Sequence, residues 1–167
     1  VLNTCYPSCS GGWESAIKVR SANQTDKLAQ NILIEGNTVF NNLGEGVAVR
    51  GSNIRIRKNT FYDNFSVNIY SNADHVTIDQ NIAYCTGASR YMRDGSVPAG
   101  IAQGDETYAG WNPSHANNLL VENNLVVGCK YGFRYLGAEP GVEQAGLKDS
   151  TVAFNTFACT TSAGVSI

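Results

Sequence analysis

Two adjacent carboxylates, Asp105 and Glu106, are the residues of this sequence whose types most directly suggest chemistry. Neighbouring carboxylates beside a groove could act as an acid/base pair or could bind Ca²⁺. Three ring-bearing side chains follow in the same segment: Tyr108, Trp111 and His115. Aromatic rings could stack on the face of a sugar, so we take the two carboxylates as catalytic candidates and the three rings as candidate contacts to a substrate.

A plainer interpretation of this segment stays open. It is then an ordered loop in which the tryptophan packs on the fold and the acids are solvated or pair with Arg90 and Arg93. The sequence contains no glycine-rich phosphate loop, no nucleophile elbow and no His-Glu-x-x-His motif. Its two histidines lie far apart and it has no Cys-x-x-Cys pair, so no structural zinc site is expected and we assign no metal ligands.

A short apolar pattern occurs five times along the chain, and its copies must position these candidates. The pattern is apolar-x-apolar-x-x-Asn-x-apolar, with its asparagines at Asn37, Asn59, Asn81, Asn124 and Asn155. The alternation of apolar and polar residues predicts short strands separated by Asn and Gly turns. A second strand is predicted to follow each asparagine, at residues 46–49, 67–70, 89–92, 132–135 and 164–167, with a further copy at 16–19.

The spacing of the asparagines locates two insertions. Successive asparagines are 22, 22, 43 and 31 residues apart, so the third and fourth intervals carry extra residues. We place these insertions near residues 93–116 and 136–148, at the same point of the repeat. Insertions on one side of a solenoid often build its binding face, so we expect a site beside them.

Repeats of this kind, made of strands only, resemble the right-handed parallel β-helix of the pectate-lyase-like superfamily. A leucine-rich repeat fits less well, because glycine-rich and β-branched segments follow the asparagine and leucine does not dominate. The resemblance implies an all-β chain: a single-stranded solenoid of about five to six coils, forming one domain over residues 1–167. Its asparagines would face inward and bond the neighbouring coil, and stacked apolar residues would form core columns. One such column would contain Val39, Phe61, Ala83, Val126 and Phe157.

The two ends of the sequence align with the middle of a repeat. Residues 1–5 match residues 125–129, and the sequence closes on a second strand at 164–167. An open solenoid end exposes core and unpaired strand edges. We therefore expect an excerpt of a longer solenoid, incomplete at both ends, with end-to-end contacts to further coils or other chains.

The second strands are expected to carry a partly basic outer face. With valine and isoleucine facing the core, the outward column would contain Lys18, Ala48, Asn68, Arg90 or Met92, Arg134 and Ser166. We take as candidate contacts to substrate Lys18, Arg50, Asn68, Tyr70 and Arg93. Arginine forks bind carboxylates and sulfates well, so such a stripe suits an acidic polysaccharide. In lyases of the resembled fold an Arg or Lys removes the α-proton, which makes Arg134 and Arg90 candidate bases. Alternatively, the stripe is a solvated strand face whose cations deter aggregation.

The five cysteines leave several pairings open. Cys85, Cys129 and Cys159 are expected to share a column on consecutive coils, where stacking distances permit a disulfide. Cys129 could bridge either neighbour, or all three could be buried thiols. Cys5 and Cys9 could close a local bridge. Any bridge would indicate an oxidising compartment. Glycosylation sequons begin at Asn23 and Asn64.

Composition narrows the function further. The 167 residues carry a net charge of −2, with 43% hydrophobic and 16% charged residues, so we expect no nucleic-acid partner. No apolar run is long enough for membrane insertion. The sequence thus predicts a secreted, extracellular or cell-surface β-helix protein that binds or cleaves an acidic polysaccharide beside the insertions. The alternative is a structural or adhesive β-helix without catalysis, part of a filament or cell-surface assembly.

Overall fold

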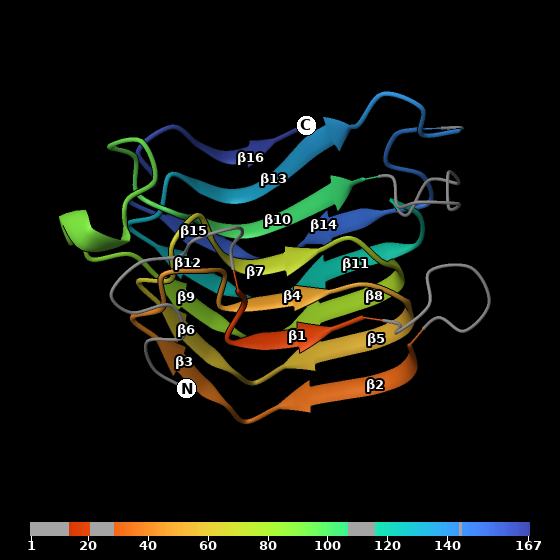
Figure 1. Cartoon of the computed structure of the whole chain (residues 1–167), viewed down its shortest axis with the longest axis horizontal. Helices are drawn as coiled ribbons and strands as arrows, with labels where there is room; N and C mark the ends of the chain where they lie inside the picture. The colour runs from red at the N-terminus through yellow and green to blue at the C-terminus, as the bar shows by residue number, and fades with distance from the viewer. Residues whose placement is uncertain (1–13, 21–28, 107–115, 144) are drawn as a thin grey trace.

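The protein winds into a solenoid of three parallel sheets (Figure 1). A computed structural model describes residues 14–20, 29–106, 116–143 and 145–167. Along these residues the chain visits the three sheets in turn, and each strand pairs in parallel with its counterparts in neighbouring coils. This is the arrangement of a parallel β-helix, so the predicted fold class is confirmed.

The three sheets contain six, five and five strands. The first sheet consists of β1 (Ile17–Val19), β4 (Val47–Val49), β7 (Val67–Ser71), β10 (Ala99–Asp105), β13 (Tyr131–Ala138) and β16 (Ala163–Ser166). The second consists of β2 (Gln30–Glu35), β5 (Ser52–Arg57), β8 (Asp74–Asp79), β11 (Leu119–Glu122) and β14 (Thr151–Ala153). The third consists of β3 (Thr38–Phe40), β6 (Thr60–Tyr62), β9 (Ile82–Tyr84), β12 (Leu125–Val127) and β15 (Thr156–Ala158).

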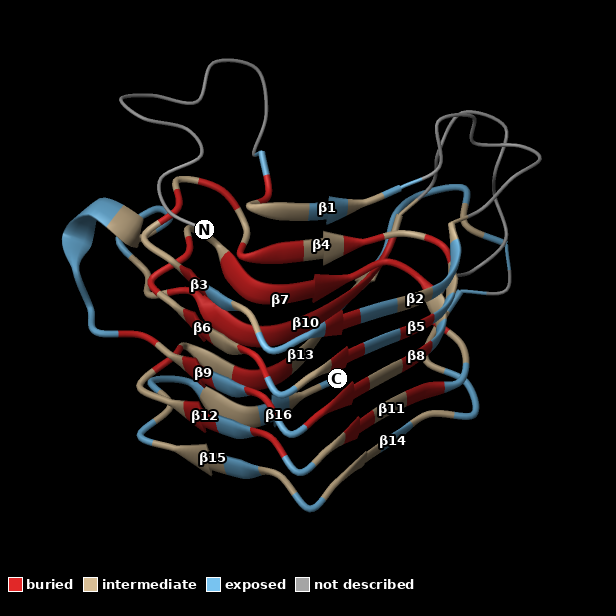
Figure 2. Cartoon of the chain, turned by 90° about the horizontal axis from the view of Figure 1, so that it is seen from below, coloured by how far each residue is buried: buried red, intermediate tan, exposed pale blue. Residues whose placement is uncertain are grey.

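Apolar side chains stack in columns inside the solenoid, as the repeat predicts. The column on the third sheet contains Val39, Phe61, Ala83, Val126 and Phe157, each aligned with the next by strand pairing. The first four are buried, and Phe157 packs against them while partly exposed. Figure 2 shows burial extending through β4, β7 and β10 of the first sheet. Both faces of β7 and β10 are therefore covered.

The repeated asparagines form a continuous hydrogen-bonded ladder between the second and third sheets. The Asn59 backbone N–H and side-chain amide both donate to Oδ1 of Asn81, each at a distance of 3.0 Å. The Asn81 amide donates to the Ile56 carbonyl of the preceding coil at 2.8 Å. The ladder thus satisfies backbone groups at a turn where the chain leaves one sheet for the next, which confirms the inward orientation that the repeat predicts.

One predicted second strand is wrong. Residues 89–92 lie outside the sheets, and η1 (Ser89–Tyr91) is an exposed 3₁₀ turn that projects at the left of Figure 1. Strand β10 instead takes the place between β7 and β13, with Ile101 opposite Ile69 and Phe133. Its small residues hide it from an apolar pattern, because Ala99, Gly100 and Ala102 carry little apolar signal.

A glycine before the inward apolar residue marks these strands better than hydrophobicity does. The dipeptides are Gly46-Val47, Gly100-Ile101, Gly132-Phe133 and Gly164-Val165. A Cβ added at Gly100 would overlap the side chain of Val126, and one at Gly132 would overlap the ring of Phe157. Glycine is therefore required at these two positions, where β10 and β13 pass the core column of the third sheet, whereas Ala16 and Asn68 occupy the same position beside β1 and in β7.

Both insertions are present with different bounds from those predicted. Strand β10 divides the first insertion, so residues 86–98 precede the strand and further residues follow Asp105. Residues 136–138 of the second insertion continue β13, and only later residues leave the sheet. Inserted segments therefore border the first sheet at both ends of its strands.

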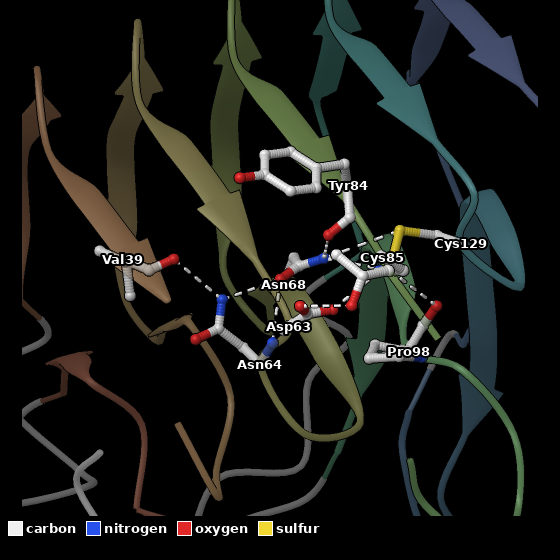
Figure 3. Close-up of a disulfide and its surroundings, with 9 residues drawn as sticks. Val39, Asp63, Asn64, Asn68, Tyr84, Cys85, Pro98 and Cys129 are labelled. Atoms are coloured by element: carbon white, nitrogen blue, oxygen red, sulfur yellow. Dashed lines mark hydrogen bonds between the residues drawn. A yellow bond between two sulfur atoms is a disulfide. The ribbon is translucent and has the colours of Figure 1, made fainter. Parts of the chain in front are cut away.

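Cys85 and Cys129 form a disulfide, with their Cα atoms 4.9 Å apart (Figure 3). This selects one of the pairings left open by the sequence. Cys159 is free and exposed, so the ladder of buried thiols is excluded for the described residues. Cys5, Cys9 and the sequon at Asn23 lie outside the described residues.

Asn68 faces the disulfide rather than the solvent, which corrects its predicted place in the outward column. Its side chain is fully buried, and its amide lies 3.4 Å from the sulfur of Cys85 and 3.7 Å from that of Cys129 (Figure 3). Its Oδ1 accepts a hydrogen bond from the Asn64 amide at 2.8 Å. Asn64 is itself fully buried, so the folded chain does not present this sequon for modification.

Candidate functional site: a groove over the first sheet

A groove crosses the outer face of the first sheet at right angles to its strands. One half lies over β1, β4 and β7, the other over β7, β10 and β13. Glu45, Tyr70 and Glu106 line both halves, so the two halves adjoin at these residues. The groove therefore follows the direction in which the coils stack, which suits an extended ligand.

The outward column beneath the groove differs from the predicted column at two positions. Strand pairing aligns Lys18, Ala48, Tyr70, Ala102, Arg134 and Ser166. Tyr70 stands where Asn68 was expected, because the register of β4 and β7 pairs Ala48 with Tyr70. Ala102 stands where Arg90 or Met92 was expected, because β10 is the true strand. Arg90 is exposed on η1, outside the strands of the first sheet, and it does not line either half of the groove.

The floor of the groove is a small apolar cluster. Val67, Tyr70 and Ala99 are buried there, and Ala48 and Tyr131 pack against this cluster and also line the groove. Strand β10 lies between the strands that carry the two tyrosines, β7 and β13. A floor of this kind can receive the apolar face of a ligand while polar groups on the walls fix its orientation.

Cationic side chains gather at the β13 end of the groove. The guanidinium carbon of Arg134 lies 4.7 Å from the ring centroid of Tyr131, a cation–π arrangement. Lys130 donates to the Ser96 hydroxyl at 3.2 Å, which ties it to the first insertion. Arg93, from the same insertion, lies 3.4 Å from the hydroxyl of Ser66.

Glu106 occupies the centre of the groove and is held by two of the predicted site residues. Arg50 donates to its Oε2 at 3.0 Å, and the Tyr70 hydroxyl donates to its Oε1 at 2.7 Å. The two hydrogen bonds occupy both carboxylate oxygens and fix the orientation of the side chain. The structure thus brings together three predicted residues from segments following β4, within β7 and following β10.

Glu45 is a second carboxylate in the groove that the sequence analysis missed. It lies in the turn before β4, and the Ser15 hydroxyl donates to its Oε2 at 2.9 Å. Burial, together with the negative charge of Glu106, raises the pKa of Glu45 to about 7, against the lowering effects of Ser15, Arg50 and Lys18. The sequence did contain a signal for Glu45, because this carboxylate lies between Gly44 and Gly46, directly before a predicted second strand.

The shifted pKa of Glu45 makes stability depend on pH. The folded chain keeps a proton on Glu45 that the unfolded chain loses above its ordinary pKa of 4.5. Unfolding therefore becomes easier as the pH rises from about 4.5 to about 7, by up to about 3 kcal/mol from this group. In Glu45→Gln this contribution should vanish. Urea unfolding of both proteins across this range measures the difference, and parallel pH profiles would refute the assignment.

Asp105 lines a small pocket beside the groove together with Glu106. It is fully buried at the end of β10, where its Oδ2 lies 3.4 Å from both the Tyr135 hydroxyl and the Gly146 backbone N–H. Through these contacts Asp105 anchors the segment that follows β13. The structure describes no group of three or more His, Cys, Asp or Glu side chains that could hold a metal ion.

Three predicted contacts, Tyr108, Trp111 and His115, lie outside the described residues. Lys18 lines the β1 half of the groove as predicted, where its ammonium group lies 3.2 Å from Oε2 of Glu14. In the part of the chain that the structure describes, no helical segment has the length and apolar character needed to cross a membrane.

Comparison with known proteins agrees with this architecture. A family described as "Right handed beta helix region" matches residues 8–167, nearly the whole sequence. No curated protein and no solved structure gives a significant match.

Proposed function

The chain belongs to the right-handed β-helix family, and on that premise we propose that its groove binds an acidic polysaccharide. The observation that carries this proposal is an excess of positive charge in the groove of a chain whose net charge is −2. Six cationic and three acidic side chains line the groove. The cations are Lys18, Arg20, Arg50, Arg93, Lys130 and Arg134.

The form of the groove suits a chain of charged sugars. It extends over five strands of the first sheet, so several sugar units can lie along it at once. The guanidinium plane of Arg134 rests on Tyr131, which leaves its edge N–H groups to bind a carboxylate or sulfate. The apolar floor around Val67, Tyr70 and Ala99 would receive the C–H faces of the sugar rings.

The disulfide supports a secreted or cell-surface location, which we propose for this protein. Disulfides persist in oxidising compartments and are rare in the cytosol. The bridge between Cys85 and Cys129 therefore favours a secreted or cell-surface protein, where acidic polysaccharides occur.

Replacing Arg134 by alanine is expected to weaken binding of a uronate oligosaccharide roughly 10-fold to 100-fold, because a charge-assisted hydrogen bond contributes about 1.5–3 kcal/mol. The matched control is Arg57→Ala, which removes the same charge from the outer face of the second sheet, where Arg57 pairs with Glu35. That control should bind normally. Isothermal titration calorimetry at two salt concentrations measures both affinities, and binding should weaken as salt rises.

Equal affinities of the two variants would contradict the proposed groove. A wild-type chain that binds no uronate or sulfated oligosaccharide, but associates as its concentration rises, would favour the structural or adhesive alternative. Exposed apolar side chains on the last coil, Phe154 and Ile167, could provide such contacts.

A further inference from the structure

We propose that Tyr62 and Tyr84 are a site of oxidative cross-linking, where hydrogen peroxide, activated by a haem peroxidase, joins the two rings as dityrosine. The new bond ties two successive coils of the solenoid together. The two rings lie on the outer face of the third sheet. Neither of them lines the groove over the first sheet, so this site stands apart from the proposed function.

Three aromatic rings stack in an outward column of the third sheet. Strand pairing aligns Phe40 on β3, Tyr62 on β6 and Tyr84 on β9, and each follows a residue of the inward core column. The rings of Tyr62 and Tyr84 are nearly parallel, with an angle of 8° between their planes and centroids 4.5 Å apart. Neighbouring strands lie about 4.8 Å apart, and both side chains leave the sheet in the same direction. The ring carbons that couple in dityrosine are therefore already neighbours.

The neighbours in this column leave each tyrosine one partner. On one side Phe40 stacks on Tyr62, with ring centroids 4.8 Å apart, and on the other side Val127 aligns with Tyr84. Phenylalanine and valine have no phenolic hydroxyl, so they cannot form a phenoxyl radical by losing a hydrogen atom. Within this column a radical on Tyr62 can therefore couple only to Tyr84.

The hydroxyl groups of the pair hold the two rings in register. Burial, the neighbouring Tyr62 and Asp63 groups and a hydrogen bond to Tyr62 together raise the pKa of Tyr84 above its ordinary value. Tyr84 thus keeps its phenolic proton, and with it the hydrogen bond, at neutral pH. Both tyrosines are only partly buried, so an oxidant can reach them from the solvent.

The coupling removes two hydrogen atoms from the protein. Each phenol gives up one electron and one proton to the peroxidase, which leaves a radical on each ring. A bond then forms between the two ring carbons that lie next to the hydroxyl-bearing carbons. Each of these carbons passes its hydrogen, as a proton, to its own phenolic oxygen, which restores the two phenols. Hydrogen peroxide takes up the two electrons and two protons and becomes two molecules of water.

The cross-link continues a covalent connection that the disulfide begins. Tyr84 directly precedes Cys85, which is joined to Cys129 of the next coil (Figure 3). Tyr62 lies one coil earlier, on β6. The two bonds together therefore connect three successive coils. Closing a loop of roughly 20 residues should raise the Tm by roughly 10 °C, by the same chain-entropy argument that applies to disulfides.

Incubation of the whole protein with hydrogen peroxide and a haem peroxidase tests the proposal. The product should be a monomer that has lost the mass of two hydrogen atoms and shows dityrosine fluorescence. After reduction of the disulfide, trypsin leaves both tyrosines in residues 59–90, and a protease that cleaves before aspartate then cuts between them. Mass spectrometry should find residues 59–62 linked to residues 79–90. Because the fold holds the rings together, the yield per chain should not change on dilution.

Substitutions in the stack provide matched controls. Tyr62→Phe and Tyr84→Phe should each lower the dityrosine yield by roughly 10-fold or more, because coupling between separate molecules lacks the advantage of proximity. The double variant Phe40→Tyr with Tyr84→Phe should restore the cross-link, now between residues 40 and 62, whose rings stack in the same way. Tyr91→Phe, on the 3₁₀ turn η1, should cross-link as the wild type does. Urea unfolding of each variant shows that a lost cross-link is not lost folding.

Each contrary outcome is distinct. A wild type that forms no dityrosine would overturn the proposal. A yield that rises with protein concentration would show coupling between molecules and would also overturn it. A cross-link that persists in both Tyr62→Phe and Tyr84→Phe would assign the bond to other tyrosines. None of these results bears on the groove, whose test is the binding of an oligosaccharide.

Discussion

Replacing Asn81 by alanine is expected to destabilise the fold by about 3–5 kcal/mol. The Asn81 side chain makes four hydrogen bonds: it accepts two from Asn59 and donates to the Ile56 carbonyl and to Asn124. Alanine would leave the Asn59 backbone N–H and the Ile56 carbonyl without these partners inside the solenoid, where water cannot replace them. Each buried polar group left unpaired costs about 1–3 kcal/mol. Urea denaturation with circular dichroism measures the loss.

The matched control is the same substitution at the end of the ladder. Asn37 donates to Glu35 and Asn59 but is partly exposed, so solvent can replace its bonds. Asn37→Ala should cost about 1 kcal/mol. Similar losses at both positions would show that the interior of the ladder has no special role in stability.

Removing the disulfide is the second large effect that we expect. The bridge closes a loop over a sequence separation of 44 residues. Opening such a loop costs about 4 kcal/mol by the chain-entropy argument, which corresponds to a fall in Tm of about 10 °C for a chain of this size. The double variant Cys85→Ala with Cys129→Ala should show this fall in calorimetry.

A control and a reductant separate the bridge from the loss of side chains. Cys159 is free and exposed, so Cys159→Ser should shift stability by less than about 0.5 kcal/mol. Dithiothreitol should lower the Tm of the wild type and leave the double variant unchanged. If dithiothreitol leaves the bridge of the wild type intact, the reduction is repeated under conditions that partly unfold the protein. A double variant as stable as the wild type would contradict the prediction.

The core of the fold could be predicted because stacking imposes repetition on the sequence. Val39, Phe61 and Ala83 occupy the same place in successive coils, so their spacing equals the length of a coil. The ladder asparagines are visible for the same reason. The sequence analysis missed strand β10 because Ala99 and Gly100 give little apolar signal. Both residues are small, which leaves room for side chains from other coils.

The site was harder to predict because its chemistry depends on residues far apart in the sequence. The environment of Glu45 comes from Ser15 and from Glu106 on another coil. Nothing in the local pattern shows that these segments meet. Asn68 shows a different limit: the alternation of a strand predicts an outward side chain, but at the start of β7 this side chain contacts the disulfide.

Chemical-shift mapping by NMR tests the central claim, an acidic polysaccharide in the groove, most directly. On titration with a uronate hexasaccharide, the account predicts that the largest changes fall on the side-chain N–H of Arg134 and on the backbone of β7, β10 and β13. Residues of β5 and β8, on the second sheet, should change little. Changes centred on the second sheet, or none at saturating ligand, would contradict the account.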